Sequence, residues 1–299
     1  MWRAVRIIYL CMWRGASFVV MSRAYNNYNE EEKQDMSGII YPSPIYGPVH
    51  SRRLGLSLGI NLLPADGKIC TFDCVYCECG YNAAHRPKLP MPTREEVRTA
   101  LEKRWAPVAR GFRDPEAVTF AGNGEPTCHP DFPAIVEDTL EVRRKVVSTA
   151  KICVLSNATQ ITRQEVHDAL HRVDLCILKL DAVSDSYIRA VNRPVGKYDI
   201  KEILEAMESF RGHVYIQTMF LKGEVNGVSV DNTGDEYVRP WILQLRRILP
   251  RHVTIYTIDR ETPEPGLKKA TWQELERIQD MVIAAGTPCS AIHPSATMK

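Results

Sequence analysis

Four cysteines lie within ten residues, in the run Cys70-Thr-Phe-Asp-Cys74-Val-Tyr-Cys77-Glu-Cys79. Thiolates are soft ligands, and cysteines this dense are typical of a site for a soft metal centre. The whole chain has nine cysteines in 299 residues, an odd number that is too small for a disulfide-rich secreted scaffold. The spacing therefore indicates a metal site. If fewer than four cysteines bind, the metal centre keeps a coordination position open. If all four bind, the site is a structural zinc or an electron-transfer cluster.

The elements that must position this loop alternate along the chain as strand and helix. Short apolar runs, typical of parallel strands covered on both faces, predict six strands: 56–63, 117–122, 151–157, 175–182, 214–221 and 253–260. Segments with helical periodicity predict six helices: 93–105, 131–146, 162–173, 198–210, 235–249 and 271–286. Capping boxes of the form Thr-x-x-Glu are predicted at Thr93 and Thr162.

Six strand–helix units fit either an open doubly wound sheet or a barrel-like sheet, and periodicity alone does not separate the two. In both architectures the loops that follow the strands form the functional site. The cysteine run follows the first predicted strand. The strand ends that come after it are therefore the places to search for its partners.

Composition predicts an ordinary globular protein. The 38 Lys and Arg residues balance 36 Asp and Glu residues, and 44% of residues are apolar, which excludes histone-like, acidic-tail and disordered classes. No run reaches the roughly 18 apolar residues that a membrane helix needs, so we expect a soluble protein. Residues 1–22 faintly resemble a secretory signal, but Arg14 interrupts the apolar run. We predict a disordered N-terminal extension, or an artefact of an upstream start, over 1–35 and a single domain over 38–299.

Three of the cysteines, Cys70, Cys74 and Cys77, form a C-x3-C-x2-C motif with the aromatic Tyr76 before the last one. This motif, placed after a first strand and before repeated βα units, resembles that of the radical S-adenosylmethionine (SAM) superfamily. The resemblance implies that three thiolates hold a [4Fe–4S] cluster and that the fourth iron binds SAM. It also implies reductive cleavage of SAM to methionine and a 5′-deoxyadenosyl radical, which abstracts hydrogen from a substrate. A fourth thiolate would block that iron. Three roles therefore stay open for Cys79: a contact with the cluster's surroundings, a contact with a substrate, or a small half-buried thiol without a function.

The turn after the second strand, Ala121-Gly-Asn-Gly-Glu-Pro126, is similar to the superfamily's Gly-Gly-Glu turn. In the resemblance Gly122, Gly124 and Glu125 meet the amino group of SAM, and Asn123 is a departure from the family pattern. Glycine lets the backbone approach a ligand closely. The alternative is a plain strand–helix turn.

Polar residues also end the later strands. In the resemblance Asn157, Lys179 and Asp181 face the methionine carboxylate and the ribose of SAM, and Tyr76 offers its ring to the adenine. Lys179 and Asp181 could instead form a buried ion pair. Further cofactor-lining candidates, for which core packing is an equal alternative, are Gln217 and either Tyr256 or Ile258.

A longer phrase, YGPVHSRRLGLSLGINLLP with the cysteine motif and FAGNGEPTCHPDF, resembles an uncharacterised group of Fe–S oxidoreductases related to the wybutosine (tRNA-imidazoguanosine) synthesis enzyme. This resemblance implies an α/β fold with a partial (β/α)6 TIM-like barrel of the radical SAM type, and it suggests a tRNA guanosine as substrate. Two departures oppose that substrate. Only Cys11 lies upstream of the motif, where the wybutosine enzyme has a second cluster, and the chain lacks the basic charge of a tRNA-binding protein.

Three functions therefore stay open: a radical SAM enzyme that acts on a small molecule or a protein, a tRNA-modifying radical SAM enzyme, and a non-catalytic iron–sulfur protein whose cluster Cys79 closes. For the enzyme we expect a flavodoxin- or ferredoxin-type electron donor, a reducing cytoplasm and no membrane partner. The catalytic residues are unknown at this point.

Some basic and titratable residues have no place in the resemblance. The run His50-Ser-Arg52-Arg53 could clamp a phosphate or carboxylate, or form surface salt bridges. The basic stretches 104–113 and 143–147 could form a tRNA patch or a solvated face. His129 could transfer protons, or be a solvent-exposed loop histidine.

Overall fold

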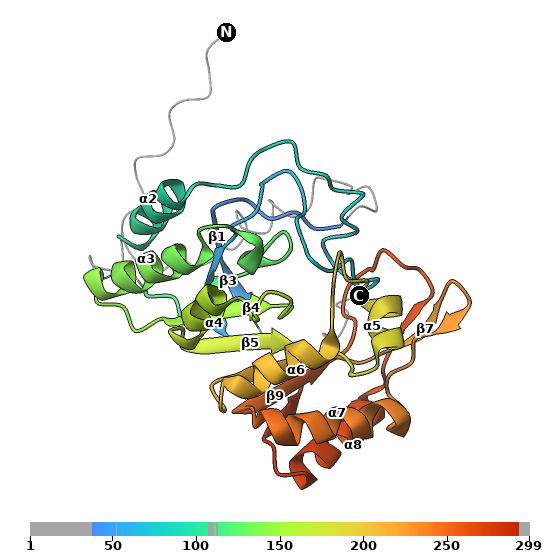
Figure 1. Cartoon of the computed structure of the whole chain (residues 1–299). Coiled ribbons are helices and arrows are strands. Elements are labelled where there is room, and N and C mark those ends of the chain that lie inside the picture. Colours follow the sequence, from blue (N-terminus) through green and yellow to red (C-terminus); the bar gives the residue numbers. More distant parts are fainter. Residues whose placement is uncertain (1–37, 52, 107–110, 112, 293–299) are drawn as a thin grey trace, which may run out of the picture. The chain divides into compact units, whose positions relative to one another are not determined.

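The structure of the protein is a computed structural model that describes residues 38–292 except 52, 107–110 and 112 (Figure 1). All of these residues belong to the unit Ser37–Lys299. The extension predicted over 1–35 and Arg52 lie outside the described residues.

The main sheet contains all six predicted strands, each shorter than its apolar run. They are β2 (Gly55–Ile60), β3 (Ala117–Phe120), β4 (Lys151–Ser156), β5 (Leu175–Lys179), β6 (Tyr215–Met219) and β9 (His252–Tyr256). Each pairs in parallel with the next in this order. A doubly wound sheet would reverse its strand order at a switch point. The unreversed order therefore selects the barrel-like alternative.

Two further strands lie at the edges of this sheet. β1 (Ile45–Ser51) pairs antiparallel with β2, and β11 (Cys289–Ala291) pairs in parallel with β9. Within the described residues no pairing joins β1 to β11, so the sheet stays open as a partial barrel. A separate small sheet has the order β10-β7-β8, formed by Leu267–Lys269, Leu221–Val225 and Val228–Ser229.

The predicted helices are confirmed within a few residues. The helices are α2 (Arg94–Trp105), α3 (Phe132–Lys145), α4 (Gln164–His171), α5 (Asp185–Val191), α6 (Ile200–Ser209), α7 (Asp235–Ile248) and α8 (Trp272–Ala284). The capping box at Thr93 is confirmed. The one at Thr162 is wrong, because α4 has Arg163 at its N-cap and no side-chain cap. None of the described helices is long and apolar enough to cross a membrane.

The strands bury alternate residues against the helices, as a pleated strand must. The main core contains strand residues such as Leu58, Val118, Ile152 and Ile216. The intervening residues point to the opposite, concave face of the open sheet. They include Ser57, Thr119, Cys153, Ile177, Lys179, Gln217 and Tyr256.

A second, smaller core holds the cysteine loop. Its buried members include residues of the loop, of α5 and of β7: Phe72, Val75, Tyr76, Tyr187, Val191, Leu221 and Val225. Figure 1 shows α5 and β7 beside each other at one end of the main sheet. These added elements therefore support the loop from the side.

Candidate active site

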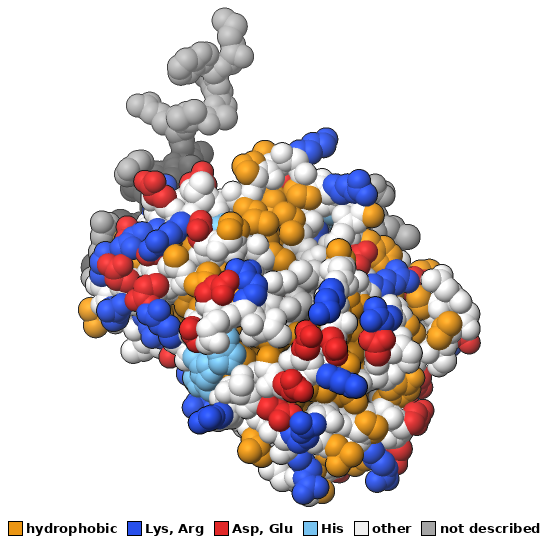
Figure 2. Space-filling model, in the orientation of Figure 1, with side chains coloured by type: hydrophobic (Ala, Val, Ile, Leu, Met, Phe, Trp, Pro, Cys, Tyr) orange, Lys and Arg blue, Asp and Glu red, His pale blue; other side chains and the backbone are white. Residues whose placement is uncertain are grey.

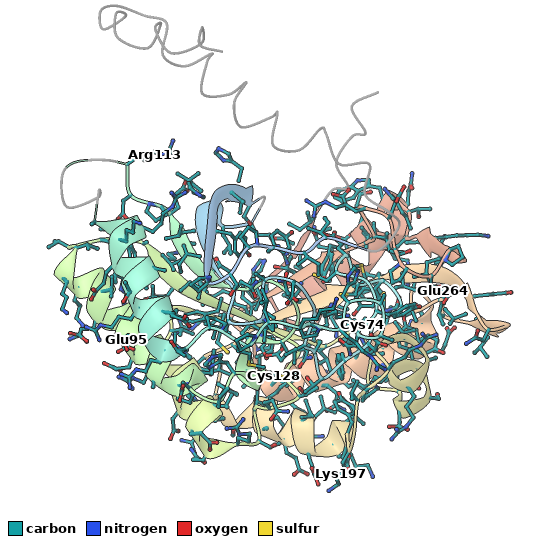
Figure 3. The ribbon with its side chains drawn as sticks, turned by 90° about the horizontal axis from the view of Figure 1, so that it is seen from above. Cys74, Glu95, Arg113, Cys128, Lys197 and Glu264 are labelled. Atoms are coloured by element: carbon teal, nitrogen blue, oxygen red, sulfur yellow. The ribbon has the colours of Figure 1, made fainter. Side chains whose placement is uncertain are left out.

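The cysteine loop lines a cavity of about 170 Å³ at the carboxyl ends of the parallel strands. Its lining includes all four loop cysteines and six of the predicted cofactor-binding residues: Cys70, Cys74, Cys77, Cys79, Tyr76, Gly122, Gly124, Glu125, Asn157 and Lys179. In Figure 3 Cys74 lies among interior side chains, whereas Glu95, Arg113 and Lys197 lie at the rim of the view. The fold thus brings together residues that are far apart in the sequence.

A larger groove of about 650 Å³ lies between β1 and α2. Its lining is mainly apolar, with basic residues such as Lys103, Arg104 and Arg113, and the described residues that line it include no cysteine or histidine. Because the smaller cavity gathers thiols, a carboxylate and amides, it is the better candidate for chemistry.

Two cysteines of the loop have a side-chain amide as a neighbour. Asn157 Nδ2 lies 3.5 Å from Cys70 Sγ, and Asn192 Nδ2 lies 3.6 Å from Cys74 Sγ. Burial raises the pKa of Cys74 to about 11, against opposing effects that include the Lys179 ammonium. These amides are donors that a thiolate would accept from.

Cys79 differs from the other three cysteines. Its thiol donates to Gly122 O over 3.6 Å. A hydrogen bond from Cys79 lowers the pKa of Cys77, while the same contact and burial raise the pKa of Cys79. The single thiol proton of Cys79 thus has two alternative acceptors, Gly122 O and Cys77 Sγ.

Lys68 is a buried cation beside the cysteines that the sequence analysis missed. Its Nζ donates to Gly80 O at 2.6 Å and lies 3.6 Å from Asp73 Oδ1. Burial alone would lower the pKa of Lys68, but the sulfurs of Cys77, Cys70 and Cys74 and the Asp73 carboxylate raise it overall. The position of Lys68, two residues before the first motif cysteine, is the sequence signal that could have pointed to this residue.

The glycine-rich turn lies against the start of the cysteine loop. Ile69 N donates to Asn123 O at 3.0 Å, and Glu125 N donates to Ile69 O at 3.0 Å. Gly124 has φ +128°, and a Cβ at this position would lie 1.9 Å from Ile69 O. Glycine is therefore required here by contact between two segments of the chain itself.

The side chain of Asn123, the departure from the family pattern, faces away from the cysteine loop's sulfurs. Its Nδ2 donates to Tyr41 O at 2.9 Å and to Pro64 O at 2.8 Å, and its Oδ1 accepts from Tyr41 N at 2.7 Å. Asn123 thus fastens the turn to the segment before β1.

Glu125 links the loop after β3 to the end of β4. Its buried carboxylate accepts from Thr127 N at 3.1 Å, Thr127 Oγ1 at 2.6 Å, Ser156 Oγ at 2.8 Å and Asn157 N at 2.6 Å. Burial raises the pKa of Glu125, although these donors oppose the shift. The carboxylate thereby fixes Asn157 beside Cys70.

Asp181 and Lys179 form the buried ion pair that was the alternative interpretation. Lys179 Nζ lies 3.4 Å from Asp181 Oδ1, and the Asp181 carboxylate also accepts from the Tyr76 hydroxyl and from Asn192 Nδ2 at 2.7 Å. Burial alone would lower the pKa of Lys179, but Asp181, Tyr256 and Cys74 raise it. The Lys179 ammonium also lies 4.8 Å from the centre of the Tyr76 ring.

The remaining candidates from the sequence, Gln217, Tyr256 and His129, lie in different surroundings. Gln217 lines the cavity, and Tyr256 accepts from Lys179 Nζ at 3.1 Å. His129 is buried, which contradicts the predicted exposed histidine: its Nε2 lies 2.8 Å from Pro92 O, and its Nδ1 accepts from Asp131 N at 3.1 Å. These contacts make it a structural link to the segment before α2.

An open parallel sheet with cysteines gathered at its strand ends is typical of a class of metal-cluster proteins, and the comparison with known families identifies the family. Residues 66–229, more than half of the chain, match the radical SAM superfamily. The chain therefore belongs to the radical SAM superfamily. This superfamily uses a [4Fe–4S] cluster and SAM, which are thus the protein's cofactors.

Solved structures agree with this membership at the level of the fold. A radical SAM methyltransferase from Sphaerobacter thermophilus has a TM-score of 0.56 at 15% identity, covering 79% of this chain and 65% of that one. The anSMEcpe structure with bound AdoMet has a TM-score of 0.54 at 15% identity, covering 79% and 63%.

Curated relatives are similar over part of their length. A UPF0026 protein from Methanocaldococcus jannaschii is 33% identical over 183 residues, covering 59% of this chain and 53% of that protein. A protein of Brachyspira hyodysenteriae named GTPase Obg is 24% identical over 265 residues, covering 85% of this chain and 36% of that protein. The chain thus spans between about a third and half of these two relatives.

Proposed function

We propose that this chain is a radical SAM enzyme in which Cys70, Cys74 and Cys77 hold the [4Fe–4S] cluster and SAM binds in the same cavity. The observation that carries the proposal is the shared cavity: three motif cysteines line it together with Gly122, Gly124, Glu125, Asn157 and Lys179. Held there by the three cysteines, a reduced cluster would supply the electron for reductive cleavage of SAM and so provide hydrogen-abstracting radical chemistry.

The residues around the cavity fit a cluster held by thiolates. The amides of Asn157 and Asn192 point at Cys70 and Cys74, and Lys68 places a buried positive charge near all three sulfurs. Hydrogen bonds and charge next to the sulfurs are among the means by which a protein tunes the potential of such a cluster. In this proposal Lys68 offsets the negative charge of the thiolates.

The other residues bind and orient. The ion pair of Lys179 with Asp181 and the amide of Asn157 present polar groups on one side of the cavity, suited to the carboxylate and hydroxyls of SAM. Tyr76 is held in place by Asp181 and Asn192, which fixes its ring beside the motif. Glu125 keeps the glycine-rich turn and Asn157 in register.

Cys79 distinguishes the enzyme from the closed-cluster alternative. Its single thiol proton has Gly122 O, 3.6 Å away, and Cys77 as its acceptors. In this proposal Cys79 stays a protonated neighbour of the cluster and is not a fourth ligand. An open iron is what SAM binding requires in the proposed mechanism.

Paired cysteine variants test the proposal. We expect Cys77→Ala to lose bound iron and all 5′-deoxyadenosine production under dithionite. We expect Cys79→Ala, two positions away in the same cavity, to keep its full iron and sulfide content. Electron paramagnetic resonance of the reduced wild type should shift when SAM is added. An unshifted signal, or loss of iron in Cys79→Ala, would return the protein to the four-cysteine alternative.

The substrate and partners are part of the proposal. We expect a small-molecule or protein substrate, a flavodoxin- or ferredoxin-type donor, and a cytoplasmic location that protects the exposed iron from oxygen.

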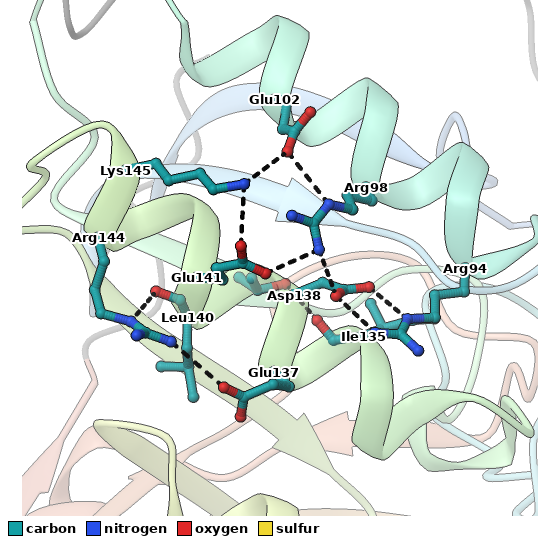
Figure 4. A network of polar contacts seen from close by, with 11 residues as sticks. Arg94, Arg98, Glu102, Ile135, Glu137, Asp138, Leu140, Glu141, Arg144 and Lys145 are labelled. Carbon is teal, nitrogen blue, oxygen red and sulfur yellow. Dashed lines mark hydrogen bonds and ion pairs between the residues drawn. The ribbon is translucent and has the colours of Figure 1, made fainter.

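A tRNA substrate finds less support, because the basic residues of the stretch 143–147 form ion pairs within the chain. Arg143 pairs with Asp174. Figure 4 shows the other two pairs: Arg144 Nη2 lies 3.4 Å from Glu137 Oε1, and Lys145 Nζ lies 3.0 Å from Glu141 Oε1. On the face shown in Figure 2, basic and acidic side chains are intermixed.

A further inference from the structure

The concave face of the open sheet continues from the cysteine cavity and carries several polar side chains. Its partly exposed residues along β5, β6 and β9 include the apolar Ile177 and the polar Lys179, Gln217, Thr254 and Tyr256. Gln217 and Lys179 also line the cavity. A molecule on the concave face would therefore lie directly next to the proposed SAM site.

Arg53 reaches this face from the turn between β1 and β2. Its Nη1 donates to Gln217 Oε1, and its guanidinium carbon lies 5.3 Å from the centre of the Tyr256 ring. Both partners belong to strands on the other side of the sheet from β2. The Arg53 charge also acts on the Cys153 thiol of β4, where it opposes the rise in pKa caused by burial. The side chain thus lies over the sheet and not away from it.

Arg53 is an exposed cation with uncharged partners. Within the described part of the chain it makes no ion pair, and its remaining N–H groups have no acceptor there. Lys179, the other cation on this face, is already paired with Asp181 at 3.4 Å. The Asp181 carboxylate is in turn engaged by Tyr76 and Asn192. Among the described residues named on this face, Arg53 is therefore the cation without an anionic partner.

Tyr256 offers a second free donor at the same place. Its hydroxyl oxygen accepts from Gln217 Nε2 at 2.7 Å and from Lys179 Nζ at 3.1 Å. Both contacts use the oxygen as acceptor, so its own proton has no acceptor among the residues described. A guanidinium and a hydroxyl proton, both without an anionic partner, suit the oxygens of a carboxylate or phosphate.

We propose that Arg53 and Tyr256 form an anion-binding subsite for the substrate, and that the substrate is a molecule carrying a carboxylate or a phosphate. This inference rests on the proposed function, because it uses the SAM cavity to define where the substrate reacts. The chain Arg53–Gln217–Tyr256–Lys179 links the subsite to the cavity. The anionic group binds at Arg53, and the part of the substrate that gives up hydrogen faces the cavity.

Calorimetric titration of the full-length, anaerobically reconstituted protein tests the subsite. Inorganic phosphate and acetate are titrated separately in chloride buffer, with SAM at saturation. We expect at least one anion to bind, with phosphate preferred for a phosphoryl substrate and acetate for a carboxylic acid. Arg53→Gln should weaken binding by about tenfold or more, the effect of losing a hydrogen bond to a charged group. Arg53→Lys should fall between, because lysine keeps the charge without the bidentate fork.

The matched control is Arg113→Gln, an exposed arginine whose ion pair with Glu116 spans 3.6 Å. It should bind the anion as the wild type does. Iron content and far-ultraviolet circular dichroism must match the wild type in every variant.

Three results would overturn the subsite: no binding of either anion by the wild type, wild-type binding by Arg53→Gln, or binding that is seen only without SAM, which would make the site the cofactor's own. The same preparation is assayed for 5′-deoxyadenosine. SAM cleavage without anion binding removes the subsite alone. Anion binding without SAM cleavage removes the proposed function and, with it, the substrate role of the subsite, so the two failures are distinguishable.

Discussion

Gly124 shows at the scale of a single residue how the turn and the cysteine loop depend on each other. A Cβ at this position would lie 1.9 Å from Ile69 O, one residue before the first motif cysteine. We expect Gly124→Ala to reduce the free energy of unfolding by about 2–4 kcal/mol, which combines the left-handed backbone with overpacking. It should also lower the iron bound after reconstitution, because the loop must shift. Urea unfolding and iron analysis measure the two effects.

Gly196 is the matched control for that substitution. It also has a positive φ, +94°, but a Cβ there meets nothing within 4 Å. Gly196→Ala should cost only about 1–2 kcal/mol for the backbone conformation and leave iron binding unchanged. Equal effects at the two glycines would show that the contact with Ile69 is unimportant.

Sequence reasoning found the residues whose signal is local and missed those whose partners are distant. The cysteine spacing and the Gly-x-Gly-Glu turn are readable within a few positions. Asn192 is not, because its contact with Tyr76 joins residues 116 positions apart. The run 50–53 already makes Arg53 a candidate to clamp a phosphate or carboxylate, but its contact with Gln217, 164 positions away, is known only from the fold. Only topology distinguishes such residues from ordinary polar surface.

At the scale of elements, α2 and α3 are joined by an ion-pair network around Asp138 (Figure 4). The Asp138 side chain is 4% exposed and accepts from Arg94 Nε at 2.6 Å and from Arg98 Nη1 at 2.8 Å. Asp138→Asn should therefore reduce the free energy of unfolding at pH 7 by about 1–3 kcal/mol, since hydrogen bonds to a buried charge are lost. Glu102→Gln, in the exposed part of the network, should cost less than about 1 kcal/mol.

The stability difference between the wild type and Asp138→Asn should also depend on pH. The hydrogen bond from Arg94 is the main cause that lowers the pKa of Asp138 below its usual 3.8. The unfolded chain therefore takes up the proton first, so the stabilisation is present above about pH 4 and is lost as the pH falls through the lower folded pKa. The difference between wild type and Asp138→Asn should shrink below pH 4. A difference that stays constant with pH would rule out the charge as its origin.

The same scale shows why the predicted strands ran too long. The apolar run 214–221 predicts one strand, but β6 ends at Met219 and β7 begins at Leu221. Asp181 accepts from Met219 N at 2.9 Å, and Asn232 accepts from Leu221 N at 2.9 Å. Polar groups from elsewhere in the chain thus end the strand while its residues stay apolar. The short α5 was missed because seven residues give too little periodicity.

At the scale of the whole described unit, the fold has two cores with different dependence on the site. The main core packs the parallel strands against the helices and contains no residue of the cysteine motif. The second core is built around Phe72, Val75 and Tyr76 of the motif loop, and Cys70 and Cys77 pack against it. A cluster that binds only the folded loop stabilises the second core first.

Removing the cluster should therefore loosen the protein unevenly. We expect chelator-treated protein, compared with the reconstituted form by hydrogen-exchange mass spectrometry, to exchange about tenfold or more faster over residues 70–79, α5 and β7, which corresponds to ~1.4 kcal/mol of local stability. The strands β2 to β5 should keep their protection, because their packing against α2, α3 and α4 does not involve the loop. Cys77→Ala should reproduce the exchange pattern of the chelated form without chelator. Equal acceleration across the main sheet would show instead that the two cores unfold as one cooperative unit and that the cluster stabilises them together.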